Sequence, residues 1–542
     1  MHAQGPDAPG KRMAMPRRQG TPGLWLFYAP LFALLLTFGG CATPPSEVPH
    51  VPSHAIVDGD RTPLGQAFAA QAERHRGLSG FQVIAGGHSA FAARAALADA
   101  AERSLDLQYF SVGEDLTTDL LLSRIAMAAE RGVRVRILLD DIHPSARAFA
   151  RRAMGANPGI EVRLYNPFLL GEASSLVRLG ELVVDGERLN RRMHNKLWVT
   201  DNVVAIVGSR NLGDEYFDAS EAGNFRDVDL LAIGPVVGLA SRAFDLYWNS
   251  PASIPLAGLG GVPDTTSAAA QRTALQGQAA ACSGKGPCHW LSERGLLDSL
   301  RAGSLALTWA NARFVFDPPE GDKPALFSGI EHGWVDDRPG GIRTQRELLI
   351  VSPYFVPSED GQRHLFEMRA RGVRVAVLTN SLASIDSVAA HAGYARYRAA
   401  LLGGGVELYE TRPQPGVPHR RSHRWGHPSP AILHAKFIVQ DRSRVIVGSL
   451  NQDPRSRLHN TEAWIEVDSP ELALDLAALF DEASDPHHAF QLAINRAAGP
   501  DALEWLTEEG GESVRYQVEP FTDAWLRLWR DLLGAMLPEH LL

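Results

Sequence analysis

Apolar and polar residues alternate in short runs along most of the chain, in a pattern that predicts strands separated by amphipathic helices. Residues 105–110 (LDLQYF) and residues 133–139 (VRVRILL) predict strands. Between them, residues 116–131 carry apolar positions at helical spacing, and Gly132 follows as a helix-ending residue. Strands that alternate with helices in this way indicate an α/β fold.

The order of elements in the first half of the chain returns in the second half. Residues 347–352 predict a strand, and a helix is expected to run to Arg371 and to end at Gly372. Residues 373–378 then predict the counterpart of the strand at 133–138, because the stretches around them read RGVRVAVL and RGVRVRIL. An internal repeat of this kind predicts two homologous halves of one fold.

The first forty residues differ in composition from the rest of the chain. Basic residues precede an apolar run at 24–38, which is followed by two glycines and Cys41. A run of this length is short for a membrane-spanning helix and fits the core of a signal peptide. Small residues directly before a cysteine resemble a bacterial lipobox, although Phe38 stands where that pattern prefers Leu. The resemblance implies acylation of Cys41 after removal of residues 1–40, with an uncleaved anchor as the alternative.

Composition and charge limit what the protein binds. The chain has 542 residues, of which 45% are hydrophobic and 21% charged, as is usual for globular proteins, and it is long enough for two core-forming units. The formal net charge of −9 argues against a protein dedicated to nucleic acid, so no nucleic-acid partner is expected. Three cysteines are too few for a disulfide framework.

Two stretches share the pattern His-x-Lys-x4-Asp, each followed after a short apolar run by Gly-Ser-x-Asn. The first consists of His194, Lys196 and Asp201, followed by Ser209 and Asn211. The second consists of His434, Lys436 and Asp441, followed by Ser449 and Asn451. Because the same residue types recur at the same offsets in both halves, the pair is a specific signal.

The spacing within each stretch suits phosphodiester chemistry. Residues i and i+2 of a strand share one face, so His194 and Lys196 point the same way, as do His434 and Lys436. Each strand then turns at its aspartate and returns with the Ser and Asn of Gly-Ser-x-Asn beside the His and Lys. Two facing hairpins of this kind would surround one phosphate, whose oxygens the lysines and amides bind while one histidine attacks phosphorus and the other protonates the leaving alcohol. The lysines supply positive charge, so no metal or other cofactor is expected.

Each catalytic histidine needs an acidic partner that fixes its tautomer and orientation. Asp227 follows His194 by 33 residues, and Glu462 follows His434 by 28 residues. We predict that these two carboxylates orient the histidines, each within its own half. Ordinary surface carboxylates are the alternative for both, and the first half also offers Asp229 and Glu215.

The paired motifs are similar to those of the phospholipase D superfamily, over residues 85–542. Finer matches resemble the bacterial cardiolipin synthases, especially the C-type subgroup, in LDLQYF, HNKLWVTDNVVAIVGSRNLGDEYF, FRDVDLLAIGPVV, SPYFVPS, TNSLASIDSVAAHAGYARYR and the terminal LPEHLL. The resemblance implies an α/β fold of two homologous phospholipase D-like α/β/α halves with one active site at their interface. It also implies His194 as nucleophile and His434 as general acid.

The same resemblance implies transfer of a phosphatidyl group onto a lipid alcohol through a phosphohistidine intermediate. Phosphatidylethanolamine or phosphatidylglycerol would be the donor and phosphatidylglycerol the acceptor, and a single chain would carry out catalysis. Three other functions share the motif: hydrolysis of phospholipid to phosphatidic acid, a nuclease, and a lipoprotein that binds lipid without catalysis. Transfer and hydrolysis differ in whether a lipid alcohol or water reaches the phosphohistidine, and the sequence leaves that choice open.

Changes of pattern predict the boundaries of the segments. These are a lipoprotein signal peptide at 1–40, a tether at 41–78, the first half at 79–254, a linker or insertion at 255–300, the second half at 301–490 and a C-terminal helical segment at 491–542. In the last segment, the helical pattern favours packing against the core over contact with a membrane, and its apolar positions are Trp525, Leu526, Leu528, Trp529, Leu532 and Leu533.

The remaining predictions concern the cell envelope. Residues 42–43 (Ala-Thr) follow Cys41 without the Asp that commonly retains lipoproteins in the inner membrane. We therefore expect a lipid-anchored protein at the periplasmic face of the outer membrane, with the inner membrane as the alternative. In that oxidising compartment Cys282 and Cys288 are expected to form a disulfide, with free thiols or a metal site as alternatives. The basic, His-rich stretch at 419–427 is expected to be a solvated loop near the mouth of the site.

Overall fold

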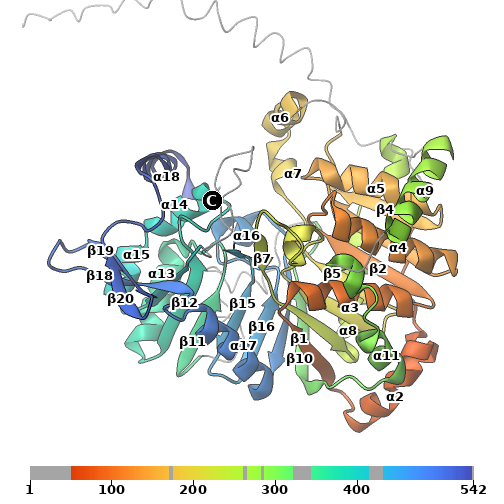
Figure 1. Cartoon of the computed structure of the whole chain (residues 1–542), viewed down its shortest axis with the longest axis horizontal. Helices are drawn as coiled ribbons and strands as arrows, with labels where there is room; N and C mark the ends of the chain where they lie inside the picture. The colour runs from red at the N-terminus through yellow and green to blue at the C-terminus, as the bar shows by residue number, and fades with distance from the viewer. Residues whose placement is uncertain are drawn as a thin grey trace, which may run out of the picture.

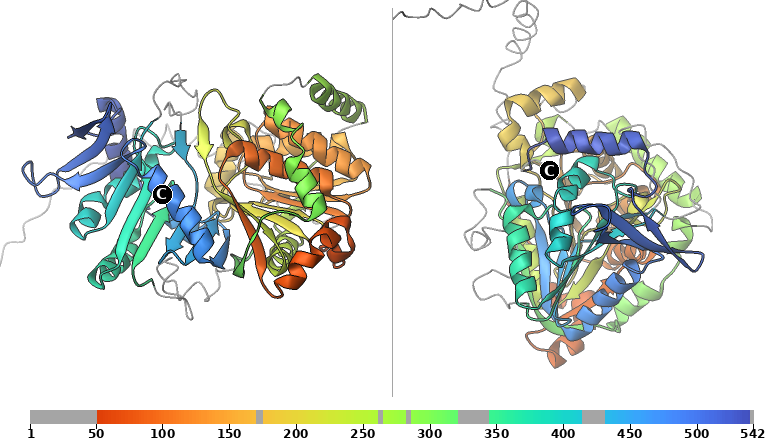
Figure 2. Two further views of the ribbon diagram at one scale, coloured as in Figure 1. Left: turned by 60° about the horizontal axis from the view of Figure 1, so that its bottom comes forward. Right: turned by 90° about the vertical axis from the view of Figure 1, so that its left-hand side faces the viewer.

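The computed structural model describes residues 51–169, 175–260, 265–281, 286–320, 344–413 and 431–539. The predicted signal peptide, Cys41, Cys282 and the stretch at 419–427 lie outside these ranges. Figure 1 shows two halves side by side, each built on a sheet that helices cover, and both halves are also distinct in the left-hand view of Figure 2. The predicted α/β fold with two homologous halves is confirmed.

The first half is built on a mixed sheet with the strand order β1-β8-β6-β5-β2-β3-β4-β9. Strands β2, β3 and β4 run parallel to one another, and the other neighbours are antiparallel. The strands are Ser79–Ile84 (β1), Ser104–Tyr109 (β2), Arg134–Asp140 (β3), Ile160–Tyr165 (β4), Leu197–Thr200 (β5), Val204–Gly208 (β6), Asp229–Ile233 (β8) and Ser253–Pro255 (β9).

The sheet of the second half repeats this order as β10-β17-β16-β15-β11-β12-β13-β18, and β19 and β20 extend it. The long strand β10 pairs with β17 at one end and with β1 at the other, so the two sheets are continuous. The strands are Thr308–Phe316 (β10), Glu347–Val351 (β11), Arg374–Asn380 (β12), Glu407–Thr411 (β13), Phe437–Gln440 (β15), Arg444–Gly448 (β16), Ala463–Asp468 (β17), Ala489–Ile494 (β18), Leu503–Glu509 (β19) and Glu512–Tyr516 (β20).

Helices cover both faces of each sheet. The outer face of the first sheet carries α2 (Pro63–Arg74), α3 (Gly87–Ala100), α4 (Leu116–Glu130), α5 (Pro144–Ala156), α9 (Thr265–Ala281) and α11 (Gly295–Ala302). The outer face of the second carries α13 (Ser358–Ala370), α14 (Val388–Ala395) and α15 (Arg398–Gly403). As expected, Gly132 follows α4 and Gly372 follows α13, at φ angles of 91° and 87° that suit glycine at a helix end.

One hydrophobic core joins the two halves. Helices α8 (Pro235–Trp248) and α17 (Pro470–Ala483) pack on the inner faces of the sheets. Their buried side chains, such as Phe244 and Leu476, form a single cluster with strand residues of both halves. These strand residues include Val199, Val207, Val439 and Val447. Because this apolar surface is shared, the halves form one folding unit and fix the geometry of whatever lies at their junction.

Three segment predictions differ from the structure. The predicted tether contains η1 (Gly59–Arg61) and α2, whose Leu64 and Phe68 are buried in the core of the first half. The predicted linker contributes η3 (Leu256–Leu259), α9, α10 (Pro287–Trp290) and α11, and α9 and α11 also pack on that core. The predicted helical C-terminus contains the end of β18, then β19 and β20, before it reaches α18 (Ala524–Met536). In the predicted tether and linker, the apolar residues that pack on the core lack the sustained periodicity that predicts a helix.

The proposed disulfide falls partly outside the described residues. Cys288, in α10, is disulfide-bonded in the structure. Its predicted partner Cys282 lies in the stretch 282–285, which is outside the described ranges. The pairing of these two cysteines therefore stays a prediction.

Candidate active site

The first His-x-Lys segment is held in place by the second half of the chain. His194 and Lys196 come just before β5, in the middle of the first sheet. The backbone N–H of His194 donates to the carbonyl of Thr461 at 2.9 Å, and the N–H of Thr461 donates to the carbonyl of Arg192 at 2.8 Å. This short ladder joins the motif of one half to the segment that precedes β17 in the other.

The second His-x-Lys segment makes the same crossing in the opposite direction. His434 and Lys436 come just before β15, and the N–H of His434 donates to the carbonyl of Arg226 at 2.8 Å. The parallel pair β7 (Asn224–Arg226) and β14 (Ala431–Leu433) secures the crossing. Both motifs therefore meet at the junction of the halves, near the labels β7 and α16 (Pro454–Leu458) in Figure 1.

The orienting carboxylates also cross between the halves. His194 Nδ1 lies 2.8 Å from Glu462 Oε2, and His434 Nδ1 lies 2.9 Å from Asp227 Oδ1. An ionised carboxylate only accepts hydrogen bonds, so each Nδ1 carries a proton and donates, and Nε2 is the ring nitrogen left to attack phosphorus or to exchange a proton. The sequence reasoning identified both carboxylates but assigned each to the histidine of its own half, and that assignment is wrong. Each carboxylate ends an interface segment that runs beside the motif of the opposite half.

The two alternatives in the first half have other environments. The Asp229 carboxylate accepts from the guanidinium groups of Arg94 and Arg210, at 3.0 and 3.2 Å, within the first half. Glu215 lies in η2 (Asp214–Tyr216), and burial raises its pKa to about 7. Asp227 and Glu462 are therefore the residues that the structure pairs with histidine.

The two serines of Gly-Ser-x-Asn hold the carboxylates. Ser209 Oγ donates to Asp227 Oδ1 at 2.5 Å and accepts from the N–H of Val228, while Ser449 Oγ donates to Glu462 and accepts from the N–H of Ala463. Both hydroxyls are fully buried. The prediction that these serines bind phosphate is therefore wrong, because their hydrogen-bonding capacity is used to fix the acidic partners.

The two asparagines differ from each other. Asn211 Nδ2 donates to the hydroxyl of Tyr216 at 2.9 Å, and Asn211 Oδ1 accepts from the N–H of Ser111 at 3.3 Å. Asn451 is buried, and its Oδ1 makes no hydrogen bond to the described residues. Phosphate binding by either amide stays a prediction.

Two buried ammonium groups lie beneath the histidines. Lys196 Nζ donates to the carbonyl of His194 at 2.5 Å, and Lys436 Nζ donates to the carbonyl of His434 at 2.6 Å. Burial lowers the pKa of Lys196 well below its usual value and that of Lys436 to about 8, although nearby carboxylates oppose the shift. An ammonium carries three donors, so each lysine that is protonated has protons left for a phosphoryl oxygen.

The two histidines differ in their affinity for protons. Burial lowers the pKa of His194 well below its usual value, and the charges of Lys196 and Lys436 lower it further. Burial and the charges of Lys436 and Lys196 also lower the pKa of His434, although Asp227 opposes the shift by its charge and its hydrogen bond. The first histidine is therefore the stronger candidate for a neutral nucleophile and the second for a proton donor.

The aspartates of the two motifs lie away from the histidines. Asp201 follows β5 at the start of β2, where its carboxylate accepts from the N–H groups of residues 102, 103 and 104. Asp441 does the same for residues 345, 346 and 347 at the start of β11. A strand rises about 3.3 Å per residue, so the five residues after each lysine carry the aspartate to the other end of the strand, away from the histidine. The prediction that they are catalytic is wrong; both are structural.

Aromatic rings that sequence reasoning missed surround the histidines. Phe110 stands edge-on to His194 with ring centroids 4.9 Å apart, and Lys196 Nζ lies 5.1 Å from the centre of the same ring. Tyr216 and Phe225 lie 5.4 and 5.0 Å from His434. Phe110 is the last residue of the predicted strand at 105–110. Its position at the end of that strand is the sequence feature that could have indicated contact with His194.

Two further observations concern the described residues. Within the described ranges, no group of three or more His, Cys, Asp or Glu side chains is placed to hold a metal ion. None of the helices there has the length and apolar character needed to cross a membrane.

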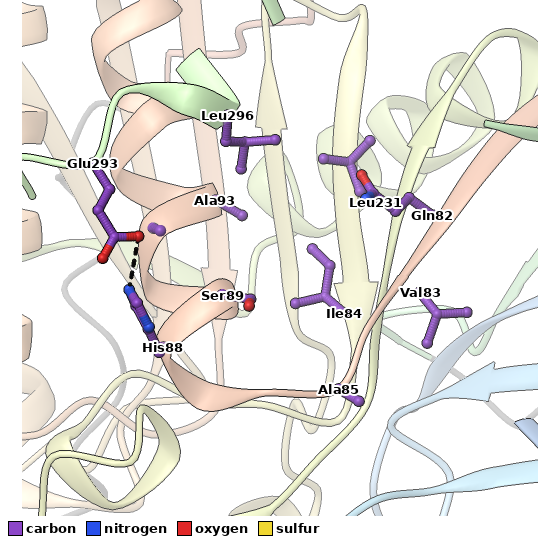
Figure 3. A pocket seen from close by; sticks show the side chains of 11 residues that line it. Gln82, Val83, Ile84, Ala85, His88, Ser89, Ala93, Leu231, Glu293 and Leu296 are labelled. Atoms are coloured by element: carbon purple, nitrogen blue, oxygen red, sulfur yellow. Dashed lines mark ion pairs between the residues drawn. The ribbon is translucent and has the colours of Figure 1, made fainter. Parts of the chain in front are cut away.

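A separate hollow of about 300 Å³ lies between β1 and α3 (Figure 3). Its lining includes Ile84, Leu231 and Leu296, and at its rim His88 Nε2 lies 3.2 Å from a carboxylate oxygen of Glu293. None of the lining residues belongs to the two motifs, so this hollow is distinct from the histidine site.

A repeated α/β half that contributes one His-x-Lys segment to a shared centre defines the phospholipase D class of enzymes. The family model described as "Cardiolipin synthase, PLD-like domain" matches residues 95–226 and 342–483, one block in each half. The chain belongs to this family.

The chain is also similar to individual proteins. The chain is 37% identical to cardiolipin synthase C of Escherichia coli (strain K12) over 495 residues, which cover 88% of this chain and 99% of the relative. It is 22% identical to cardiolipin synthase A of Klebsiella pneumoniae (strain 342), over 82% of this chain and 76% of the relative. Among solved structures, a phosphatidylserine synthase from Haemophilus influenzae Rd KW20 matches 78% of this chain and 91% of its own, with 11% identity and a TM-score of 0.48.

Proposed function

We propose that the protein is a cardiolipin synthase that transfers a phosphatidyl group between phospholipids through a phosphohistidine. The observation that carries the proposal is the crossed pair of buried His–carboxylate dyads above two lysines at one centre. The similarity to cardiolipin synthase C over nearly the whole chain supports phospholipid as the substrate.

In the first step, Nε2 of His194 attacks the phosphorus of the donor lipid. The bond between phosphorus and the headgroup oxygen breaks as the N–P bond forms, and His434 gives its proton to the leaving alcohol. Glu462 stabilises the His194 ring by accepting from Nδ1, and the Asp227 carboxylate favours the protonated form of His434. Lys196 and Lys436 offset the negative charge that gathers on the phosphoryl oxygens.

In the second step, a lipid alcohol takes the place of the departed headgroup. His434, now neutral, accepts the proton of the incoming hydroxyl while its oxygen attacks phosphorus and the N–P bond breaks. The step frees His194 and returns His434 to its protonated state, so the cycle is closed. The donor would be phosphatidylglycerol or phosphatidylethanolamine and the acceptor phosphatidylglycerol, and one chain would hold the complete site.

The membrane setting is part of the same proposal. Acylation of Cys41 would anchor the chain at the periplasmic face of the outer membrane, with the inner membrane as the alternative. Several acyl chains on one residue anchor stably where a single chain is marginal. A Cys41→Ala variant should leave the membrane fraction, whereas tight membrane binding at full precursor mass would contradict acylation.

The direct test is incubation of the full-length protein with vesicles of phosphatidylglycerol and phosphatidylethanolamine, followed by lipid mass spectrometry. We expect cardiolipin as the main product, with free glycerol or ethanolamine in equal amount. Phosphatidic acid as the main product would show that water, not a lipid alcohol, reaches the intermediate. A His194→Ala, His434→Ala double variant serves as the blank.

A further inference from the structure

Helix α18 presents an apolar face to solvent. Of its large apolar residues, Leu526 is buried against the core at 4% exposure, whereas Trp525 is 70% and Met536 74% exposed. The exposed set follows helical spacing on one side and consists of Trp525, Leu528, Trp529, Leu532 and Met536. The expectation that this helix packs its apolar pattern into the core is therefore met by Leu526 and in part by the half-buried Leu533, whereas the other apolar positions of the pattern are exposed.

Helix α6 (Ser175–Val184) has a second exposed apolar face, in the other half. Val183 and Val184 are 75% and 74% exposed, and Leu179 and Leu182 are exposed as well. Its polar side chains face the protein instead: Arg178 donates to the carbonyl of Asp141 at 2.5 Å. The helix is thus held to the protein by polar contacts while its apolar residues point outward.

Both helices lie near the strand ends at which the site is found. Arg178 of α6 donates to the carbonyl of the residue after β3, and His143 in the same loop packs edge-on against Phe110, the ring beside His194. On the other half, α18 packs on α14, as Gly534 lies against Ala392. Helix α14 follows the loop that contains Asp386. The carboxylate of Asp386 accepts from the hydroxyl of Tyr354, and its negative charge raises the pKa of Lys436.

The figures place these two faces on one side of the molecule. In Figure 1, α18 and α6 lie along the upper side, with β7 and α16 of the histidine site between them. After a turn of 90° both helices remain on that side (Figure 2, right). Two apolar helices from different halves therefore flank the site on a common side, as a single flat partner would require.

We propose that α6 and α18 form a docking surface for a phospholipid bilayer, which holds the site against the membrane that contains its substrate. The proposal rests on the lipid activity proposed above. Exposed tryptophans beside aliphatic residues on a helix suit the interface between headgroups and acyl chains. An apolar patch of this kind marks an interaction site, and a bilayer reaches both helices at once, beside the site where its lipids react.

The test places an environment-sensitive fluorophore on an added cysteine in the full-length protein, reconstituted in phosphatidylglycerol vesicles. The labelled positions are Leu532→Cys in α18 and Leu182→Cys in α6. Leu474→Cys in α17, at 54% exposure, is the matched control because it is equally apolar and exposed but belongs to neither helix. Spin-labelled acyl chains and aqueous iodide serve as the two quenchers, and the unmodified protein gives the background of its own cysteines.

We expect lipid quenching of at least about twofold at positions 532 and 182, with protection from iodide, and the opposite at position 474. Equal access of iodide to all three positions would overturn the proposal. Nanodiscs that each hold one protein separate a bilayer from a second copy: docking on lipid persists there, and loss of the signal would assign the surface to another chain. The same labels in a His194→Ala background do not depend on turnover, so the docking surface and the proposed activity can fail separately.

Discussion

The two histidines stand on copies of one hairpin, yet they differ in what surrounds them. His194 Nδ1 lies within hydrogen-bond distance of both carboxylate oxygens of Glu462, and its ring packs edge-on against Phe110. Burial and the charges of two lysines lower its pKa well below the usual value. His434 contacts one oxygen of Asp227, whose charge counters the effect of burial on its pKa. The motif fixes which atoms meet, and we propose that the partners contributed by the opposite half divide the roles of nucleophile and acid.

The largest effects should come from the histidines. His194→Ala should abolish the phosphohistidine and lower turnover by about 10⁶-fold, because no nucleophile remains. His434→Ala should lower turnover by about 10²–10⁴-fold, since only proton transfer is lost. With an activated leaving group, His434→Ala should still accumulate covalent phosphate, detected by mass spectrometry of a quenched reaction. The reverse pattern would exchange the two roles.

The carboxylates should have the next largest effects. Glu462→Gln and Asp227→Asn keep the shape of each side chain but remove the charge that fixes the histidine, and each should lower turnover by roughly 10²–10⁴-fold. Neutral Gln and Asn still accept from the serine hydroxyls, so thermal unfolding should change little. If either variant kept wild-type turnover, its carboxylate would have no part in orienting the ring.

The pH dependence separates the lysine from the histidines. The pKa of Lys436 is lowered to about 8, so its charge is present below that pH and is lost as pH rises through it. Turnover should therefore fall above about pH 8. Lys436→Arg should extend the plateau to higher pH, because a guanidinium stays charged, even if its shape lowers the maximal rate. An alkaline limb that stays in place would assign the titration to another group.

The smallest effects on chemistry are expected at the two motif aspartates. Asp201→Ala removes a fully buried carboxylate and leaves three backbone N–H groups without their acceptor, one of them buried, and should cost about 3 kcal/mol of stability. Asp441→Ala makes the same change at a more exposed edge and should cost about 1 kcal/mol. Denaturant unfolding measures both changes in stability. The folded fraction should retain turnover within about threefold, a much smaller loss than removal of a general acid causes. A much larger loss of turnover would return the aspartates to the site.

The sequence predicted the parts of this molecule that depend on local pattern. Alternating apolar runs and their repeat gave the two halves, and the spacing of His194 with Lys196 and of His434 with Lys436 gave the side chains that meet. The crossing of Asp227 and Glu462 could not be predicted, because sequence separation favours partners within one half and the pairing depends on how the halves pack. The roles of Ser209 and Asp201 were misjudged for a related reason: a hydroxyl or carboxylate near a motif reveals its acceptor or donor only in three dimensions.

The exposure of α18 marks a similar limit. Its apolar spacing was read correctly as helical, but periodicity alone does not say whether an apolar side faces protein or solvent. The buried α2 and α9 show the converse, since weakly patterned segments were predicted to be tether and linker yet pack against the first half. Both cases are decided by the surface that the rest of the fold offers.

The crossed centre can be tested most directly in a His434→Ala background with an activated donor, where only formation of the phosphohistidine at His194 is observed. In that background, Glu462→Gln should slow formation by about 10²-fold because it acts on the remaining histidine, whereas Asp227→Asn should change the rate by less than about twofold because its histidine is already absent. Rapid quenching and peptide mass spectrometry give both the rate and the modified residue. A large effect of Asp227→Asn with no effect of Glu462→Gln would contradict the crossed pairing.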